Sequence, residues 1–375
     1  MDEKLARDCI EKRKAGVSVN IAILRRTYIT ELDGVNNFIF SLSEGLENLG
    51  HKVHVVTWSF KGVEKPENLT DWAWKTFAAK PEIISLKQNA CNGNPWTQIS
   101  WDWLTNGSKL LKKLDIDAVI INGITPLRFS GKKIAVNHGI YEMRPNKPQK
   151  AIVKRLYKNC TRVCVSQKLA KEFRSFFGLD CSVIPLPLRL SQFKSVKPEE
   201  RENTILHVGT RRIKNVEKSI EILRTLKKKG VNVKLIVVGA KNDYVESLIQ
   251  HEKHSNLNIE AKYNIPHNAL IDLYSRAKAM LLPSKYEALA YVAIEAMASG
   301  TPVVVSAQIP AEAVTDGYNG FRTETYNPTD YAEKLALLLR DEKLWNELSR
   351  NAVQSVNQYD HIEVAREYEK LITRA

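Results

Sequence analysis

Short apolar runs alternate with amphipathic stretches along most of the chain, which is the pattern of strands joined by helices. In the N-terminal half, apolar residues at helical spacing predict a helix over 36–49, which Gly50 ends, and Asp33, Gly34 and Val35 are predicted to form a turn before it. Apolar runs predict strands over 19–24, 51–57, 118–122, 133–137 and 162–165. Strand, helix and strand in this order indicate parallel βαβ units.

The same pattern starts again after Pro185-Leu186-Pro187, a segment that interrupts regular structure. Strands are predicted over 204–208, 234–238, 257–260 and 279–282, and helices over 216–228, 244–251, 267–275, 288–298 and 330–340. A length of 375 residues exceeds what one hydrophobic core usually serves. We therefore predict two α/β domains with a hinge at this segment.

Two glutamates, Glu287 and Glu295, have seven residues between them and stand among small and apolar neighbours. If residues 288–298 are helical, the step between them is about 2.2 turns and roughly 12 Å of rise, so both carboxylates share one face. That spacing suits the two ends of a sugar nucleotide, with Glu287 accepting hydrogen bonds from sugar hydroxyls and Glu295 from the ribose diol. The alternative is a helix-start acid at Glu287 and a solvated helix residue at Glu295.

The segment 207–216 joins a predicted strand to a predicted helix, where open α/β sheets hold ligands. Gly209 lets the backbone approach a ligand, and Lys214 with either Arg211 or Arg212 can neutralise a diphosphate. The alternative is a pair of solvated basic residues. A second candidate is His138, which ends the predicted strand 133–137, although a lone histidine there is often structural.

The segment 283–305 contains Pro-Ser, both glutamates, Glu-Ala-Met-Ala, Gly and Pro-Val-Val in that order. It resembles the donor-binding signature of the retaining family 4 glycosyltransferases. The resemblance implies a GT-B fold, in which two Rossmann-like, doubly wound parallel-sheet domains face each other across a cleft. It implies an acceptor-side domain at 1–187, a nucleotide-sugar-binding domain at 188–354, and a last helix of about 355–375 that packs back onto the first domain. It also implies retaining transfer from a nucleotide-diphosphate sugar to a lipid-linked or cell-envelope glycan.

The resemblance also assigns residues to the site. It implies that Lys214 and an arginine contact phosphate, that His138 lies beside the reacting sugar, and that Gly34 matches one glycine of a Gly-Gly-Val loop near the donor. Relatives usually carry Glu-Gly-Phe-Gly where this chain has Glu287-Ala288-Leu289-Ala290. Two alanines imply a tighter or rearranged loop around the sugar. This departure motivates an alternative function, a non-catalytic sugar-nucleotide or glycolipid binding subunit.

The formal charge of +14 is concentrated in residues 1–190, where 30 Lys and Arg oppose 18 Asp and Glu, against 26 and 24 in the rest. It predicts an anionic partner, either a membrane surface or a phosphate-bearing acceptor. The basic run 144–158, which contains Ile152, Val153 and Leu156, predicts contact with anionic lipid or a solvated face. No zinc-finger or RNP-type motif accompanies the charge, which argues against nucleic acid.

Several chemistries are not favoured by the sequence. Asp115-Ile116-Asp117 leads directly into a buried strand, so we expect neither a metal site there nor any required metal or cofactor. The five cysteines show no Cys-x2-Cys pair and predict buried free thiols.

The chain shows no apolar run of about 20 residues and no hydrophobic start, which predicts a cytoplasmic protein, peripheral at the inner face of the membrane where its basic surface binds. The tryptophans of 72–103 fit an acceptor pocket, an interfacial belt or core packing.

Overall fold

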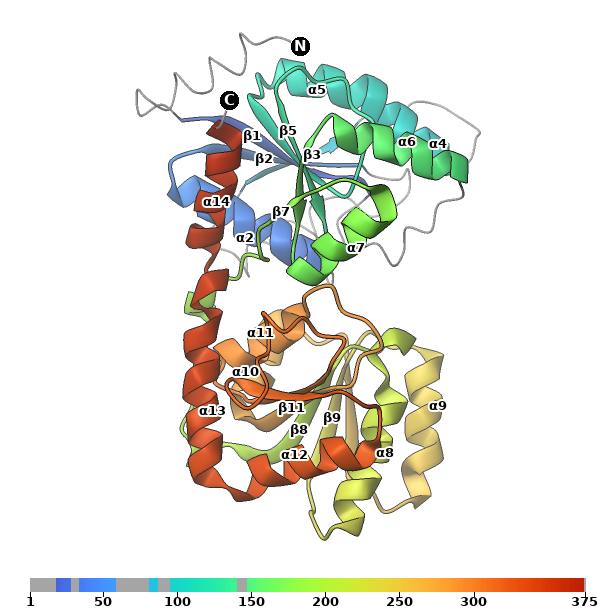
Figure 1. Cartoon of the computed structure of the whole chain (residues 1–375), viewed down its shortest axis with the longest axis vertical. Coiled ribbons are helices and arrows are strands. Elements are labelled where there is room, and N and C mark those ends of the chain that lie inside the picture. Colours follow the sequence, from blue (N-terminus) through green and yellow to red (C-terminus); the bar gives the residue numbers. More distant parts are fainter. Residues whose placement is uncertain (1–17, 28–33, 59–80, 87–94, 140–146, 374–375) are drawn as a thin grey trace. The chain divides into compact units, whose positions relative to one another are not determined.

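The computed structural model describes residues 18–27, 34–58, 81–86, 95–139 and 147–373. The polar segment 1–16 lies outside these ranges, as do Trp72 and Trp74. The chain forms two compact units, one made of Met1–Leu188 with Tyr359–Ala375 and the other of Arg189–Gln358. Each is an α/β unit built on a parallel sheet (Figure 1).

The first unit contains a seven-stranded sheet in the order β3-β2-β1-β4-β5-β6-β7, and all of its described strand pairs are parallel. The order reverses between β1 and β4, the switch point at which doubly wound sheets hold ligands. The strands are β1 (Asn20–Arg25), β2 (Lys52–Trp58), β3 (Glu82–Leu86), β4 (Ala118–Asn122), β5 (Lys132–Asn137), β6 (Thr161–Cys164) and β7 (Ser182–Val183). The five strands predicted here are thus confirmed to within one residue, whereas β3 and β7 were not predicted.

Helices α2 (Gly34–Asn48), α4 (Pro95–Asp102), α5 (Ser108–Lys113), α6 (Lys147–Lys158) and α7 (Gln167–Phe177) connect these strands. The expected turn at Gly34 and Val35 is wrong, because both residues already belong to α2. Trp103, in the π-helical turn after α4, is fully buried and donates its indole N–H to the carbonyl of Arg26. Trp101 is exposed. Core packing therefore accounts for Trp103 and not for Trp101, the two tryptophans of this group whose burial the structure describes.

The C-terminal helix α14 (His361–Thr373) belongs to the first unit and lies alongside α2 (Figure 1). Gly45 makes this contact possible, because a Cβ there would lie 2.3 Å from the carbonyl oxygen of His361. Leu188 anchors the start of α14 by exchanging backbone hydrogen bonds with Tyr359 and His361. The end of the chain is thereby fixed to the unit in which the chain begins.

The second unit contains a six-stranded sheet in the order β10-β9-β8-β11-β12-β13, again parallel at each described pair. The strands are β8 (Glu202–Val208), β9 (Lys234–Gly239), β10 (Ile259–Tyr263), β11 (Ala277–Leu282), β12 (Val303–Ser306) and β13 (Gly320–Thr323). Its helices are α8 (Val216–Lys228), α9 (Asp243–His251), α10 (His267–Arg276), α11 (Tyr291–Ala298), α12 (Pro328–Arg340) and α13 (Glu342–Ser355). The predicted strand at 257–260 is shifted to β10, and β12 and β13 were not predicted.

The helix predicted over 288–298 begins three residues late, at Tyr291. Ala290 has a left-handed backbone with φ 73°, which ends any helical run entering from Ala288. The alanine-rich composition that favoured a longer helix is a weak preference that this local conformation overrides.

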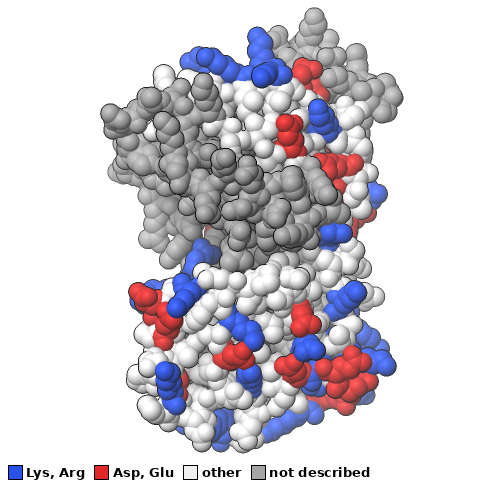
Figure 2. Space-filling view, turned by 180° about the vertical axis from the view of Figure 1, so that it is seen from behind, with Lys and Arg blue, Asp and Glu red and all other residues white. Residues whose placement is uncertain are grey.

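The charge of the second unit is mixed over the face seen in Figure 2, where acidic and basic side chains are interspersed. This fits the near balance of 26 Lys and Arg with 24 Asp and Glu in residues 191–375. Among the described residues, no helix is both long and apolar enough to cross a membrane.

Candidate functional site

A loop with two unusual backbone conformations follows β8 at the carboxyl edge of the second sheet. Gly209 has φ 115°, and a Cβ there would lie 2.7 Å from Cγ of Lys214, so the lysine stem crosses directly over the glycine. Asn215 has φ 64° and donates its side-chain amide to the carbonyl of Pro283 at 3.2 Å. A glycine and an asparagine are the residue types that tolerate such backbones. The loop therefore holds Lys214 in place.

His207 supports this loop from inside the sheet, a role that the sequence analysis did not assign. The imidazole is fully buried, and burial lowers its pKa to about 4 against a weaker raising effect of the Gly209 carbonyl. Nε2 lies 3.0 Å from the carbonyl oxygen of Gly209, and Nδ1 lies 2.8 Å from Oγ of Ser219. Because a carbonyl can only accept, the neutral ring carries its proton on Nε2 and accepts from Ser219 at Nδ1.

Lys214 and Glu287 form the centre of the candidate site. Nζ of Lys214 lies 2.6 Å from Oε1 of Glu287, and each side chain is 11% exposed. The same oxygen accepts a hydrogen bond of 2.8 Å from the buried hydroxyl of Ser284. The backbone N–H of Lys285 donates to the carbonyl of Ile213 at 2.8 Å, which joins the two loops directly. Two residues 73 positions apart in the sequence are thus brought together, as the predicted site required.

Glu295 lies one turn inside α11 and is 3% exposed, so its interpretation as a solvated helix residue is wrong. Its Oε2 accepts a hydrogen bond of 2.9 Å from the hydroxyl of Tyr274, and Nε2 of His267 lies 4.0 Å from Oε1. Oε1 has no hydrogen-bond partner among the described residues. Burial raises the pKa of Glu295, and His267 and the Tyr274 hydrogen bond oppose that effect. A buried carboxylate oxygen is thus left to accept a donor from outside the protein.

The step from Glu287 to Glu295 is only partly helical. Ala288 to Ala290 form a loop, so the expected rise along one continuous helix, and the interpretation of Glu287 as a helix-start acid, are both wrong. Leu289 and Ala290 are buried at 2% and 4% exposure. Ala290 thus has a left-handed backbone inside packed surroundings, at a position where the resemblance to family 4 glycosyltransferases implies glycine.

The two arginines of the loop differ in their surroundings. Both side chains are exposed. The guanidinium of Arg212 lies 4.4 Å from the ring centre of Tyr244 in α9, a cation–π contact. This contact commits Arg212 to packing against α9. The two arginines are therefore held differently, and either guanidinium remains a candidate for contact with phosphate.

The predicted residues of the first unit also form a group of their own. Nε2 of His138, directly after β5, lies 2.9 Å from Oδ1 of Asn122 at the end of β4. The His138 ring packs edge-on against Phe38, with 4.7 Å between ring centres. Gly34 lies one turn before Phe38 at the start of α2, and the space where its Cβ would lie contains no other atom within 4 Å. His138 and Gly34 thus flank the same end of the first sheet.

The aspartates that were weighed as metal ligands have a structural role. Oδ2 of Asp117 accepts the backbone N–H of Asn20 at 2.9 Å, and the side chain of Asn20 donates to the carbonyl of Asp115 at 3.1 Å. These bonds join the start of β4 to β1. Among the described residues, no group of three or more His, Cys, Asp or Glu is arranged to hold a metal ion.

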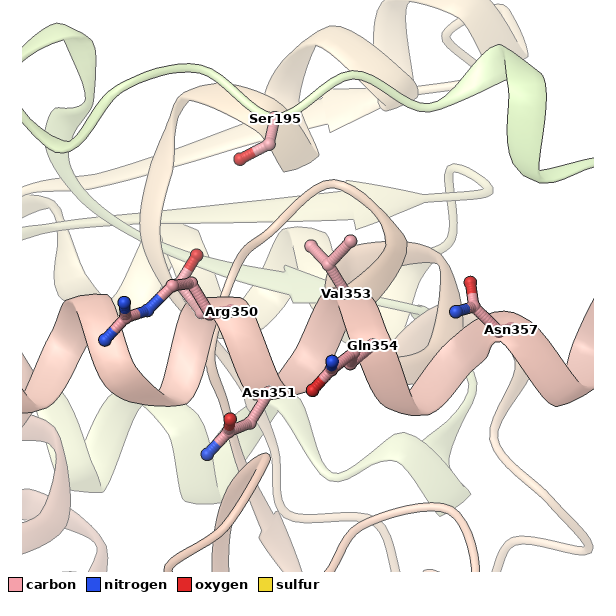
Figure 3. A pocket seen from close by; sticks show the side chains of 7 residues that line it. Ser195, Arg350, Asn351, Val353, Gln354 and Asn357 are labelled. Carbon is pink, nitrogen blue, oxygen red and sulfur yellow. The ribbon is translucent and has the colours of Figure 1, made fainter.

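A shallow groove of about 610 Å³ runs beside α13 and shares no residue with the Lys214–Glu287 site (Figure 3). Arg350 is the one titratable side chain among its lining residues. The wall is otherwise made of hydroxyl, amide and apolar groups, namely Ser195, Ser349, Asn351, Val353, Gln354 and Asn357. This groove lacks the acid and base groups of a reaction centre, whereas the loops around Lys214 contain them.

Comparison with known proteins agrees with this geometry. The family model for glycosyl transferases group 1 matches residues 189–355, and the model for glycosyltransferase family 4 matches residues 32–192. A relative from Campylobacter jejuni, N,N'-diacetylbacillosaminyl-diphospho-undecaprenol alpha-1,3-N-acetylgalactosaminyltransferase, is 38% identical over 106 residues. That match covers 28% of this chain and 28% of the relative, so less than a third of the relative's length is compared.

Solved structures show the same fold over nearly the whole chain. Sucrose-phosphate synthase from Thermosynechococcus elongatus superposes with a TM-score of 0.75 at 18% identity, covering 94% of this chain and 98% of that one. HepE of Anabaena in complex with UDP-glucose superposes with a TM-score of 0.70 at 15% identity, covering 94% and 98%. Together the two family models and these folds place the chain among the family 4-type glycosyltransferases of the GT-B fold.

Proposed function

We propose that this protein transfers a sugar from a nucleotide-diphosphate donor to an acceptor with retention of the anomeric configuration. The observation that carries the proposal is the Lys214–Glu287 pair, which two loops hold above Gly209 at the carboxyl edge of the second sheet. A cation beside a carboxylate suits a donor that has an anionic diphosphate next to a hydroxylated sugar. The UDP-glucose bound by HepE is a ligand of this class.

Each group of the site has a part in donor binding. The ammonium of Lys214 and the guanidinium of Arg211 or Arg212 neutralise the diphosphate, and Gly209 lets the backbone approach it. Glu287 accepts hydrogen bonds from sugar hydroxyls. Oε1 of Glu295, buried and without a hydrogen-bond partner among the described residues, accepts from the ribose diol. Ala288, Leu289 and Ala290 form the loop that places Glu287 against the sugar.

The reaction follows from this arrangement. The acceptor hydroxyl attacks the anomeric carbon from the face that the diphosphate leaves, and the departing phosphate takes the hydroxyl proton. Lys214 and either Arg211 or Arg212 stabilise the negative charge that develops on the leaving group. His138 donates or accepts a hydrogen bond at a donor-sugar hydroxyl. The cationic side chains occupy the role that a divalent metal fills in other transferases, so the proposed reaction requires no metal.

The proposed acceptor is a lipid-linked or cell-envelope glycan, which brings the first unit to an anionic membrane surface. The Campylobacter relative is named for a diphospho-undecaprenol acceptor. On α6, Ile152 is 62% exposed, and Arg155 and Lys158 are exposed on the same helix. An apolar side chain among basic ones suits the boundary of an anionic bilayer.

Membrane contact is tested by sedimentation with vesicles. The wild type should co-sediment with phosphatidylglycerol vesicles and far less with phosphatidylcholine vesicles, and Ile152→Glu should reduce the bound fraction several-fold. Leu337→Glu is the matched control, because Leu337 is 50% exposed on α12 of the second unit. Equal sedimentation with both lipids, or an unchanged bound fraction in Ile152→Glu, would refute the contact.

A second candidate function is a sugar-nucleotide or glycolipid binding subunit without turnover. The left-handed backbone of Ala290 favours it, because a strained residue stands where relatives usually carry glycine. Glu287, Glu295 and Lys214 are retained together, however, and binding alone would not require a group that stabilises a leaving diphosphate.

The experiment that separates the two functions begins with the donor. Thermal melting of the purified protein with UDP-, GDP- and ADP-sugars identifies the nucleotide that stabilises the folded state. Release of free nucleotide diphosphate is then measured with that donor, with and without a lipid-extract acceptor. Turnover in wild type and in Glu347→Gln, an exposed control, but not in Glu287→Gln supports the transferase. Donor binding without any diphosphate release would support the binding subunit.

A further inference from the structure

Two cysteine thiols in the first unit face each other at the end of the sheet. Cys164 is the last residue of β6, and Cys181 directly precedes β7, the neighbouring strand. Their sulfur atoms lie 2.7 Å apart and share a hydrogen bond, and both residues are free thiols. A disulfide bond is about 2.05 Å long. The two sulfurs therefore need only a small movement to become bonded.

The two thiols differ in access and in acidity. Cys164 is buried, whereas Cys181 is partly exposed. The hydrogen bond shared with Cys164 lowers the pKa of the Cys181 thiol, and the Arg162 guanidinium lowers it further, against weaker raising effects of burial and of Asp180. Arg162 is fixed nearby, because its Nε donates to the carbonyl of Asp180 at 2.7 Å. A reachable thiol with thiolate character beside a buried one is the usual arrangement of an attacking and a resolving cysteine.

We propose that Cys164 and Cys181 form a reversible disulfide by exchange with a low-molecular-weight disulfide. The Cys181 thiolate attacks one sulfur of the small disulfide, whose S–S bond breaks and releases one small thiolate. Cys164 then loses its proton, and its sulfur attacks Cys181 in the mixed disulfide, which releases the second small thiolate. Two protein thiols are oxidised and one small disulfide is reduced to two thiols, so electrons and protons balance. The chemistry is independent of the sugar-transfer proposal.

The bond would form next to the strand that carries His138. Cys164 pairs in register with Asn137 of β5, the residue before His138. Asn137 accepts a hydrogen bond from the hydroxyl of Tyr157, and Tyr157 packs against Phe173 of α7, which lies inside the loop that the disulfide would close. The oxidised form would tie β7 to β6 covalently. An upward shift of the melting temperature of the first unit is expected, because the bond restricts the unfolded chain.

The test is a map of thiols in the full wild-type chain. The protein is equilibrated in glutathione buffers from reducing to oxidising, free thiols are alkylated, and the protein is digested with trypsin. Lys168, Lys171 and Arg174 lie between the two cysteines, so the digest separates their peptides. The expected result is one linked pair of peptides, Cys164 with Cys181, that dithiothreitol reverses. Separate alkylation of both in the most oxidising buffer, or a different cysteine pair, would overturn the proposal.

Variants establish the order of attack. In Cys164→Ala, glutathione should accumulate on Cys181 as a stable mixed disulfide, whereas Cys181→Ala should leave Cys164 largely unmodified in the folded protein. Equal modification of the two variants would overturn the assigned roles. Cys160→Ser is the matched control, because Cys160 is a nearby free thiol that donates a hydrogen bond to the Leu156 carbonyl. This variant should leave the linked pair of peptides unchanged. The wild-type map decides the matter even if a variant fails to fold.

Discussion

Replacing Lys214 by methionine should destabilise the second unit strongly, because the substitution leaves Glu287 as a charge without its cation. Both side chains are 11% exposed, and after the change Glu287 keeps the hydrogen bond from Ser284. Removing one partner of a fully buried pair costs about 3–5 kcal/mol. Residual exposure and the serine hydroxyl reduce this to about 2–3 kcal/mol, which lowers the melting temperature by about 5–10 °C in a unit of this size.

The double variant isolates the interaction itself. Glu287→Gln in the Lys214→Met background removes the carboxylate that has lost its ion pair with Lys214. It should therefore recover about 1–2 kcal/mol of the lost free energy of unfolding. The assay is thermal and urea unfolding of wild type, both single variants and the double variant, followed by circular dichroism. Lys218→Met is the matched control, because Lys218 pairs with Glu221 on the surface of α8 at 21% and 37% exposure. It should cost less than about 1 kcal/mol.

Additive behaviour would refute this reasoning. If the effects of Lys214→Met and Glu287→Gln sum to that of the double variant within about 0.5 kcal/mol, the two side chains do not interact in the folded protein. The loop after β8 would then be held by its other contacts, among them those of His207 and Asn215 and the hydrogen bond from Lys285 to Ile213. Donor affinity measured on the same four proteins gives a second readout, since both single variants should lose it.

Three further predictions concern single groups of the site. Burial raises the folded-state pKa of Glu295, so its contribution to stability is fully present below the unfolded pKa and is lost as the pH rises through the folded pKa. Glu295→Gln should therefore gain stability over wild type from about pH 4.5 upward, and it should bind donor at least about tenfold more weakly. Urea unfolding and donor titration across pH check both effects. The pKa of His207 is lowered to about 4, so its contribution to folding stability is present above about pH 6.5 and is lost as the pH falls toward 4. The stability lost over this window is about 3 kcal/mol. If the free energy of unfolding falls no more steeply with pH in the wild type than in His207→Gln, this prediction is wrong. Ala290→Val should destabilise the protein by more than about 2 kcal/mol, because a β-branched residue resists the left-handed backbone. Ala290→Gly should stay within about 1 kcal/mol of the wild-type stability, because the relieved backbone strain offsets the lost methyl contact and the added entropy of the unfolded chain. Differential scanning calorimetry of both variants decides this.

The apolar runs in the sequence predicted the strands correctly wherever a strand was long and wholly buried. Residues 118–122 are five consecutive buried positions, and both the prediction and the structure give the same bounds. The strand β13 was not predicted, because only one of its four residues, Gly-Phe-Arg-Thr, has a large apolar side chain. β12 shows a Val-Val-Val run that was assigned to the motif rather than to a strand. Short strands are specified by their neighbours in the sheet, which a local pattern does not contain.

The sequence motifs predicted the residues that we propose to bind the donor, but they missed residues that position other side chains. His207 stands within an apolar strand, where a polar group must find a hydrogen-bond partner, so its position was itself a signal. His267 and Tyr274 are seven residues apart on one helix and therefore lie on the same face. That spacing predicts a common target, but Glu295 could be identified as the target only after β11 and α11 had placed it beside α10.

The loops around Lys214 and Glu287 share one physical feature, a positive φ angle. Gly209, Asn215 and Ala290 all have positive φ, and two of the three are residue types that adopt it at low cost. Ala290 adopts it because its own burial and that of Leu289 hold the loop in the core. The departure from the Glu-Gly-Phe-Gly pattern thus adds backbone strain at Ala290 and leaves Glu287 bonded to Lys214 and Ser284. The alanines therefore affect the freedom of this loop to rearrange, while the Lys214–Glu287 pair stays in place.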